Sequence, residues 1–171
     1  MKITSRGIAL SAVSAAFAVI FLVLGAYIDV LDISCLFMAS LALMLPLTKG
    51  FYLGAFLAYI ASGILGFVLT GTFRLILPFA AFFGLHPIVN QLQKKFGINR
   101  WLALAIKTLW FAGVMALCYF FTSMFVFENE FLKTYGVYIV IIGGALIFPF
   151  YDAIMTRFQY SVNAIVARLK L

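Results

Sequence analysis

The sequence predicts an all-α integral membrane protein, a compact bundle of six transmembrane helices with both termini in the cytoplasm. Three observations carry this prediction. Hydrophobic residues make up 66% of the 171-residue chain and charged residues only 10%, whereas ordinary soluble domains are about half apolar and a quarter charged. Six apolar stretches approach or reach the length that crosses a bilayer. The basic residues collect at alternate ends of these stretches.

Charged and turn-forming residues separate the six stretches. The predicted spans are 8–27, 31–47, 51–69, 73–90, 101–125 and 135–157. The first follows a basic start and is 20 residues long, too extended for the core of a signal peptide, so we expect a retained span. The second ends at Pro46 and the fourth contains Pro78 and Pro87. Either of these two spans can therefore be re-entrant or tilted rather than a regular helix.

Residues 158–171 continue the sixth stretch with apolar residues at helical spacing, interrupted by Gln159, Asn163 and Arg168. This pattern predicts a helical extension that runs along the cytoplasmic interface. No linker or low-complexity tract divides the chain. We therefore expect a single membrane domain over residues 1–171.

Charge placement supports all six spans. With a cytoplasmic N-terminus, the inner side receives nine basic residues: Lys2, Arg6, Lys49, Lys94, Lys95, Arg100, Arg157, Arg168 and Lys170. The outer side receives Asp29, Asp32, Glu128 and Glu130, against only Arg74 and Lys133. Cytoplasmic loops are enriched in Lys and Arg, so omission of the fourth span would break the pattern. The net charge of +7 thus reflects membrane orientation, and no aromatic-interleaved basic patch predicts nucleic-acid binding.

Two segments carry small residues at four-residue spacing, which places them on one face of a helix. In the third span these residues are Gly50, Gly54, Ala58, Ser62 and Gly66. Small residues let helices approach closely in lipid, and we expect this face to pack within the chain. The first span has Ala12 and Ala16. This second small face predicts a docking site for a partner helix.

Groups suited to catalysis are scarce. His86 is the only histidine, and Cys35 and Cys118 lie in apolar stretches without the spacing of metal ligands, as small buried hydrophobes do. Gly143-Gly144 lacks the Lys-Ser/Thr of a phosphate-binding loop. We therefore expect no catalytic residue, no metal and no cofactor. Any ATP hydrolysis must come from another subunit.

Polar residues of the predicted outer side converge if the topology holds, and they are the candidates for substrate binding: Tyr27, Asp29, Asp32, Arg74, Glu128, Asn129 and Glu130. Each one singly is equally well explained as a solvated loop residue. Arg74 differs from the others because a basic residue is not expected on the outer side without a reason. We expect it to contact the substrate or an outer-loop acid, and an arginine that extends to the lipid–water interface is the equally weighted alternative.

Lys107 and Asp152 are the ionisable residues set deepest in the apolar stretches. Lys107 lies about 10 Å along a helix from Arg100, and Asp152 lies about 8 Å from Arg157, so both reach a similar depth from the inner surface. A lone charge at that depth costs on the order of 2.5–3.5 kcal/mol on insertion scales. We expect the two to form a structural ion pair, with a proton or substrate relay as the less favoured alternative.

Two passages resemble the substrate-binding S-components of energy-coupling factor (ECF) transporters. Residues 8–21, with Ala12 and Ala16, are similar to the first-helix motif of that family. The run from Phe37 to Ala55, FMASLALMLPLTKGFYLGA, is similar to its second-to-third helix passage. The resemblance implies a subunit in a prokaryotic cell membrane that captures a vitamin or similar micronutrient from outside. No single substrate is indicated.

The resemblance also implies partners. The alanines of the first helix would dock a membrane-embedded T-component, and two separate ATPase subunits would drive the cycle. The substrate pocket would lie under the outer loops at 29–32, 70–72 and 127–134. Two other classes of function stay open. A non-transport scaffold that recruits partners explains the small-residue faces equally well, whereas the shortage of catalytic groups disfavours a small membrane enzyme.

Overall fold

The structure, a computed structural model, describes the backbone of residues 5–126 and 130–168 and the side chains of residues 5–121 and 135–168. Within these ranges the chain is helical apart from short connections, and no strand occurs. Six helical segments are long and apolar enough to cross a membrane: Ser5–Tyr27, Asp29–Leu47, Tyr52–Thr70, Phe73–Lys95, Arg100–Phe121 and Tyr135–Arg168. The prediction of six apolar helices is confirmed. They indicate a multi-pass membrane protein.

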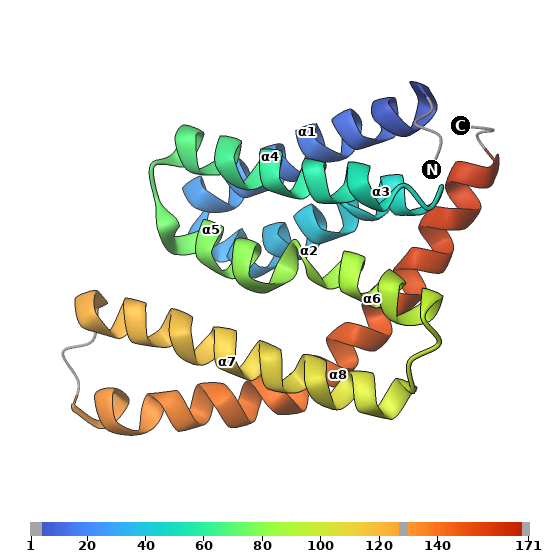
Figure 1. Cartoon of the computed structure of the whole chain (residues 1–171). Helices are drawn as coiled ribbons and strands as arrows, with labels where there is room; N and C mark the ends of the chain where they lie inside the picture. Colours follow the sequence, from blue (N-terminus) through green and yellow to red (C-terminus); the bar gives the residue numbers. More distant parts are fainter. Residues whose placement is uncertain (1–4, 127–129, 169–171) are drawn as a thin grey trace. The chain divides into compact units, whose positions relative to one another are not determined.

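The chain divides into two compact units, residues 1–95 with 155–171 (unit 1) and residues 96–154 (unit 2) (Figure 1). Unit 1 contains α1 (Ser5–Tyr27), the 3-10 turn η1 (Asp29–Leu31), α2 (Asp32–Ala42), α3 (Met44–Leu47), α4 (Tyr52–Thr70), α5 (Phe73–Pro78), the π-helix η2 (Phe79–Phe83) and α6 (His86–Lys95). Unit 2 contains α7 (Arg100–Val126) and the first part of α8 (Glu130–Arg168). The last part of α8 belongs to unit 1.

Small residues set the packing of α4 against α1. Gly54, Ala58, Ser62 and Gly66 are all buried. A Cβ atom at Gly54 would overlap Ser11 of α1, and one at Gly66 would lie 3.0 Å from Cδ1 of Leu22. Four of the five predicted small residues therefore pack within the chain. Gly50 is the exception, because it lies in the turn before α4 with a φ of 66°, a left-handed conformation that favours glycine.

Prolines interrupt the second and fourth spans, and neighbouring serines compensate. Proline has no backbone N–H, so the carbonyl four residues before it loses its helical donor. Pro46 leaves the carbonyl of Ala42, which accepts a 2.8 Å hydrogen bond from Ser14 Oγ of α1. Pro87 leaves the carbonyl of Phe83, which accepts a 2.7 Å hydrogen bond from Ser40 Oγ of α2. Both serines are fully buried.

A third hydroxyl serves the π-helix that follows Pro78. The N–H of Gly84 donates to the carbonyl of Phe79, five residues back, at 2.8 Å. This leaves the carbonyl of Ala80 without its usual helical donor, and the hydroxyl of Tyr59 in α4 donates to it at 2.7 Å. Freed backbone groups at membrane depth need such partners because lipid offers none. The second and fourth spans are thus interrupted helices.

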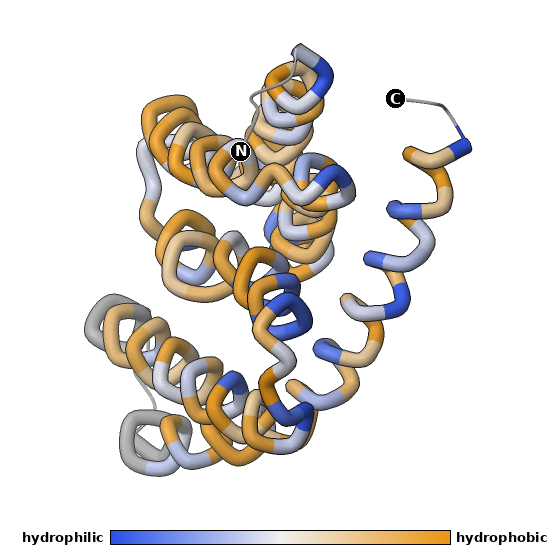
Figure 2. Tube along the Cα trace, turned by 45° about the vertical axis from the view of Figure 1, so that its right-hand side comes forward, coloured by the Kyte–Doolittle hydropathy of each residue, from blue (hydrophilic) through white to orange (hydrophobic). Residues whose placement is uncertain are grey.

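The last part of α8 packs on unit 1 instead of ending at residue 157. Met155, Gln159 and Val166 are buried on one side of it. Asn90 Nδ2 of α6 donates to Thr156 Oγ1 at 3.2 Å, which sets the register between α6 and α8. Figure 2 shows this part of α8 alternating between hydrophilic and hydrophobic residues from turn to turn. The helix predicted over 158–171 is present through Arg168 and is continuous with the sixth span.

In unit 2, α7 packs against the first part of α8 through aromatic rings and glycines. The rings of Phe111 and Phe148 stack with their centroids 5.3 Å apart. A Cβ atom at Gly144 would lie 3.2 Å from the Phe111 ring, and one at Gly136 would overlap the Tyr119 side chain. Small residues therefore allow close helix approach in this unit as well. In the Gly143-Gly144 pair, Gly144 is the residue that allows α8 to pack closely against Phe111 of α7.

Candidate functional site

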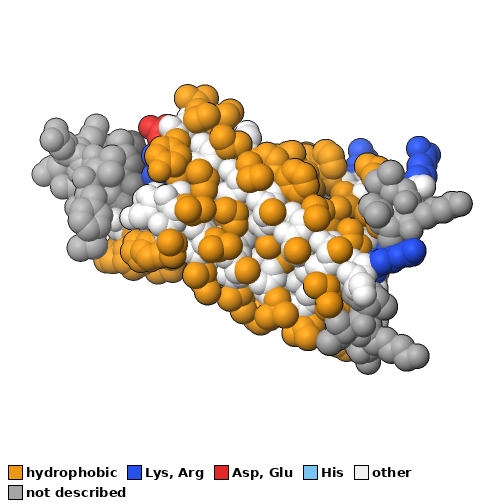
Figure 3. Space-filling model, turned by 90° about the horizontal axis from the view of Figure 1, so that it is seen from above, with side chains coloured by type: hydrophobic (Ala, Val, Ile, Leu, Met, Phe, Trp, Pro, Cys, Tyr) orange, Lys and Arg blue, Asp and Glu red, His pale blue; other side chains and the backbone are white. Residues whose placement is uncertain are grey.

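Unit 1 separates its charges to its two ends. We call the end with Asp29, Asp32 and Arg74 the acidic end. We call the opposite end the basic end, which carries Arg6, Lys49, Lys94, Lys95, Arg157 and Arg168. Exposed hydrophobic side chains cover the visible face between them (Figure 3). The two ends therefore mark where the apolar surface meets water.

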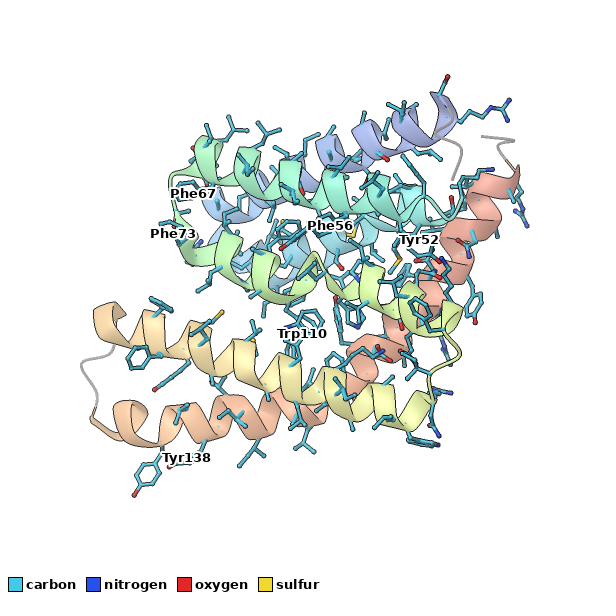
Figure 4. The ribbon with its side chains drawn as sticks, viewed as in Figure 1. Tyr52, Phe56, Phe67, Phe73, Trp110 and Tyr138 are labelled. Atoms are coloured by element: carbon cyan, nitrogen blue, oxygen red, sulfur yellow. The ribbon has the colours of Figure 1, made fainter. Side chains whose placement is uncertain are left out.

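Aromatic rings, some exposed and some half-buried, occur at both ends of the spans. Phe67 and Phe73 lie together at the acidic end with ring centroids 4.4 Å apart, and Tyr52 lies at the other end of α4 (Figure 4). Tyr27 closes α1, and Tyr160 lies in the last part of α8. Aromatic rings with a polar edge favour the interface between lipid and water. Their placement agrees with the boundaries that the charges give.

The end of α4 and the start of α5 position Arg74. Gly71 closes α4 with a φ of 64°, and its N–H donates to the carbonyl of Phe67. The hydroxyl of Thr72 then caps α5 by accepting the N–H of Arg74 at 3.3 Å. A capped first turn fixes the backbone from which the Arg74 side chain extends.

Two aspartates from the turn between α1 and α2 meet this arginine. Arg74 Nη2 donates to Asp29 Oδ1 at 2.6 Å and to Asp32 Oδ1 at 3.3 Å. The side chains are 45% exposed for Arg74, 78% for Asp29 and 26% for Asp32. Exposed ion pairs of this kind contribute little to stability. Both contacts use the same nitrogen, and Nε and Nη1 have no other hydrogen-bond partner among the described residues.

The other predicted substrate residues do not join this cluster in the described structure. Tyr27 is exposed, and its hydroxyl makes no hydrogen bond within the described part of the chain. Glu128 and Asn129 lie outside the described residues. Glu130 begins α8, but its side chain also lies outside the described part. Three of the seven candidates, Arg74, Asp29 and Asp32, are therefore placed together.

Ala12 and Ala16 lie on an exposed face of α1. The buried face of the same helix carries Ser14 and Ala18, which pack within unit 1. On the exposed face the two alanines lie near Val13 and Phe17, which are also exposed. The predicted docking alanines are thus turned away from the core of unit 1.

Lys107 and Asp152 meet within unit 2. Lys107 Nζ of α7 donates to Asp152 Oδ1 of α8 at 2.5 Å. The exposed fraction is 4% for the Lys107 side chain and 15% for that of Asp152. The short distance and the burial describe a charge-assisted hydrogen bond inside an apolar helix pair. Its position in mid-helix separates it from the loops.

Sequence reasoning missed a set of buried polar side chains in unit 1: Ser14, Ser40, His86, Asn90 and Gln159. Pro46 and Pro87 indicate that a backbone carbonyl lacks its helical donor, but they do not indicate which hydroxyl donates to it. No group of three or more His, Cys, Asp or Glu side chains within the described chain is arranged to hold a metal ion. Cys35 is buried and Cys118 half-buried, and no disulfide joins them.

Comparisons of the chain with protein-family models, with curated proteins and with solved structures gave no significant match.

Proposed function

We propose that this chain is the substrate-capturing membrane subunit of an ECF-type importer for a vitamin or similar micronutrient, energised by separate ATPase subunits. The observation that carries the proposal is the Arg74 cluster. It gathers an arginine and two carboxylates at the end of unit 1 opposite the basic residues. A polar, half-open group of this kind at the edge of an apolar surface suits the capture of a small polar molecule.

Arg74 supplies the recognition chemistry. A guanidinium is planar and always charged, and it can hold a carboxylate or a phosphate through two parallel N–H groups. Asp29 and Asp32 hold it through Nη2 alone. Nε and Nη1 lie on different sides of the guanidinium, and the N–H groups of each can donate singly to an anionic substrate group. The two carboxylates orient the arginine before the substrate arrives.

The charges also indicate how the proposed subunit is oriented in the membrane. Cytoplasmic ends of membrane proteins are rich in Lys and Arg, so the basic end lies in the cytoplasm and the Arg74 cluster faces outward. The membrane is then the cell membrane of a prokaryote, and both termini are cytoplasmic. A substrate taken from outside would meet Arg74 first.

Energy must reach this subunit from partners, since the sequence has no phosphate-binding loop. The exposed Ala12 and Ala16 support docking of a T-component, because small side chains allow a second helix to approach closely in lipid. Two separate ATPase subunits would then drive the cycle.

The direct test is mass spectrometry of small molecules that the purified full-length chain retains from its host. A substrate-capturing subunit should carry one compound at near-stoichiometric amounts, released on denaturation. Co-purification with a T-component and an ATPase pair should accompany it. Absence of a retained compound after expression in several rich media, with stable partners of another kind, would instead identify the membrane scaffold that the exposed face of α1 also fits.

A further inference from the structure

The Arg74 cluster carries more negative charge than positive charge. Arg74 Nη2 donates to Oδ1 of Asp29 and also to Oδ1 of Asp32. One guanidinium and two carboxylates leave a formal net charge of −1. Within the described part of the chain, these three side chains form no further ion pair. The cluster therefore holds one carboxylate more than its arginine needs.

Local structure accounts for Asp32 but not for Asp29. Asp32 lies in the first turn of α2, where a carboxylate stabilises the helix dipole, and it is the less exposed of the two. Asp29 begins the short turn η1, which contains no buried residue. An exposed ion pair adds little to stability, and two neighbouring carboxylates repel each other. Asp29 is therefore the carboxylate that the fold itself does not require.

The cluster keeps both hydrogen-bond acceptors and donors available. Both aspartates use Oδ1 for Arg74, so Oδ2 of each has no hydrogen-bond partner among the described residues. Nε and Nη1 of Arg74 are available in the same way. Because both aspartates contact one nitrogen of this arginine, the available oxygens and N–H groups lie within reach of one small molecule.

The net charge distinguishes between classes of ligand. An anion alone would add to the negative charge that the cluster already has. A cation alone would neutralise that charge but would leave the N–H groups of Arg74 unused. A zwitterion adds no net charge, and it supplies a positive group for a carboxylate and a negative group for the guanidinium.

We infer that the molecule captured at the Arg74 cluster is a zwitterion. Its anionic group accepts hydrogen bonds from Arg74, and its ammonium group donates to the carboxylate of Asp29. Asp32 holds Arg74 in position, and Asp29 selects for the positive group. This inference rests on the proposed function and names the substrate class of the same site.

The test compares γ-aminobutyrate, butyrate and butylammonium, which share an unbranched carbon chain and differ in charge. Binding to the full-length wild type, freed of any retained compound, is measured in detergent by calorimetric titration. The wild type should bind γ-aminobutyrate about tenfold more tightly than either singly charged probe, because each of these lacks one charge-assisted hydrogen bond. This comparison needs no variant, so a folding defect does not obscure it.

Variants then assign each charge to its residue. Asp29→Asn should make the affinities for γ-aminobutyrate and butyrate similar, whereas Asp29→Glu keeps the carboxylate and should keep the preference. Arg74→Gln should make the affinities for γ-aminobutyrate and butylammonium similar. Arg6→Gln removes the same charge at the basic end and serves as the matched control, which should behave as the wild type.

The outcomes separate this inference from the proposed function. If the wild type binds γ-aminobutyrate and butyrate equally and Arg74→Gln loses butyrate, the inference is overturned and the anion-binding subunit stands. A retained compound without a positive group has the same meaning. Unchanged binding of all three probes in Arg74→Gln, or no binding to the wild type, would count against both. A preference that persists in Asp29→Asn would refute the role of Asp29, and tightest binding of butylammonium would assign the cluster to a cation.

Discussion

The Lys107–Asp152 ion pair places two charges in an apolar helix pair, where each depends on the other. Removal of one partner leaves a buried charge unpaired, which is more costly than removal of both. We expect Lys107→Met and Asp152→Asn each to lower the free energy of unfolding by about 3 kcal/mol. The double variant should lose less than the sum.

Thermal unfolding of the four proteins in one detergent measures this cycle. The pair has a structural role if the losses are strongly non-additive. Strictly additive losses would show that the two side chains do not interact in solution, contrary to their 2.5 Å separation.

The proposed docking of a T-component on α1 is tested at Ala12 and Ala16. Replacement of both by leucine should block the close approach of a partner helix and abolish co-purification of the T-component. Retention of small molecules by the isolated chain should be unchanged, because the two side chains face away from the core of unit 1. The control is Val13→Leu with Ile20→Leu, because both residues are already large and the change adds little volume to the surface of α1. A complex that survives the alanine change would refute the docking assignment.

At the residue scale, helix rise and the placement of charges in the sequence predicted two of the contacts that the structure contains. Helix rise from Arg100 and Arg157 gave Lys107 and Asp152 the same depth, and the structure has them in contact. The unexpected sign of Arg74 led to an acid contact, which is also present. Ser14 and Ser40 carried no signal, since a serine in an apolar stretch does not reveal which carbonyl it reaches.

The interrupted helices of unit 1 depend on hydroxyls from their neighbours. Ser14→Ala would leave the Ala42 carbonyl without a donor, and Ser40→Ala would do the same at Phe83. An unsatisfied buried acceptor costs about 1–3 kcal/mol, so each change should lower stability by that amount. Ser34→Ala, at an exposed position of α2, should have almost no effect. The free energy of unfolding in detergent or in bicelles gives the comparison.

A second set of variants separates lost hydrogen bonds from lost volume. Ser14→Thr and Ser40→Thr keep the hydroxyl, and Ser14→Cys and Ser40→Cys keep the size but weaken the donor. If the alanine and cysteine variants lose equal stability and the threonine variants, which keep the hydroxyl, do not, the hydrogen bonds to the carbonyls are responsible. No loss in either alanine variant would contradict this account of the proline breaks.

At the scale of elements, composition predicted the number of helices and prolines predicted their irregularity. Pro46, Pro78 and Pro87 lie at or beside the interruptions that the structure contains. The sequence did not define where the sixth helix ends. Arg157 looks like a boundary charge, yet Met155, Gln159 and Val166 bury a continuous stripe across it. The helix thus continues past this charge while one side of it stays buried in unit 1.

The whole molecule is proposed to lie with its basic end in the cytoplasm. Topology is tested with single cysteines in a chain whose Cys35 and Cys118 are replaced by alanine. Val30→Cys, in the exposed η1 turn, should react with a membrane-impermeant maleimide in intact cells. Ile98→Cys, between α6 and α7, should react only after the cells are opened. The reverse pattern would contradict the outward-facing Arg74 cluster.

The division into two units was not predicted, because hydropathy identifies spans but not which spans pack together. Contact between helices depends on small side chains at matching heights, as at Gly54 and Ser11 or at Gly144 and Phe111. Such matches join positions that are far apart in the sequence, so hydropathy along the chain does not reveal them. The expectation of a single membrane domain stays a prediction.

The Arg74 cluster is proposed to bind the captured molecule. Equilibrium binding of the retained compound to the wild type, Arg74→Ala and Arg74→Lys in the same detergent tests it directly, with Arg100→Ala as the control. We predict a loss of affinity of about tenfold or more for alanine and a partial loss for lysine, because lysine keeps the charge but not the fork. The control should match the wild type. Equal affinities in all four proteins would contradict the claim.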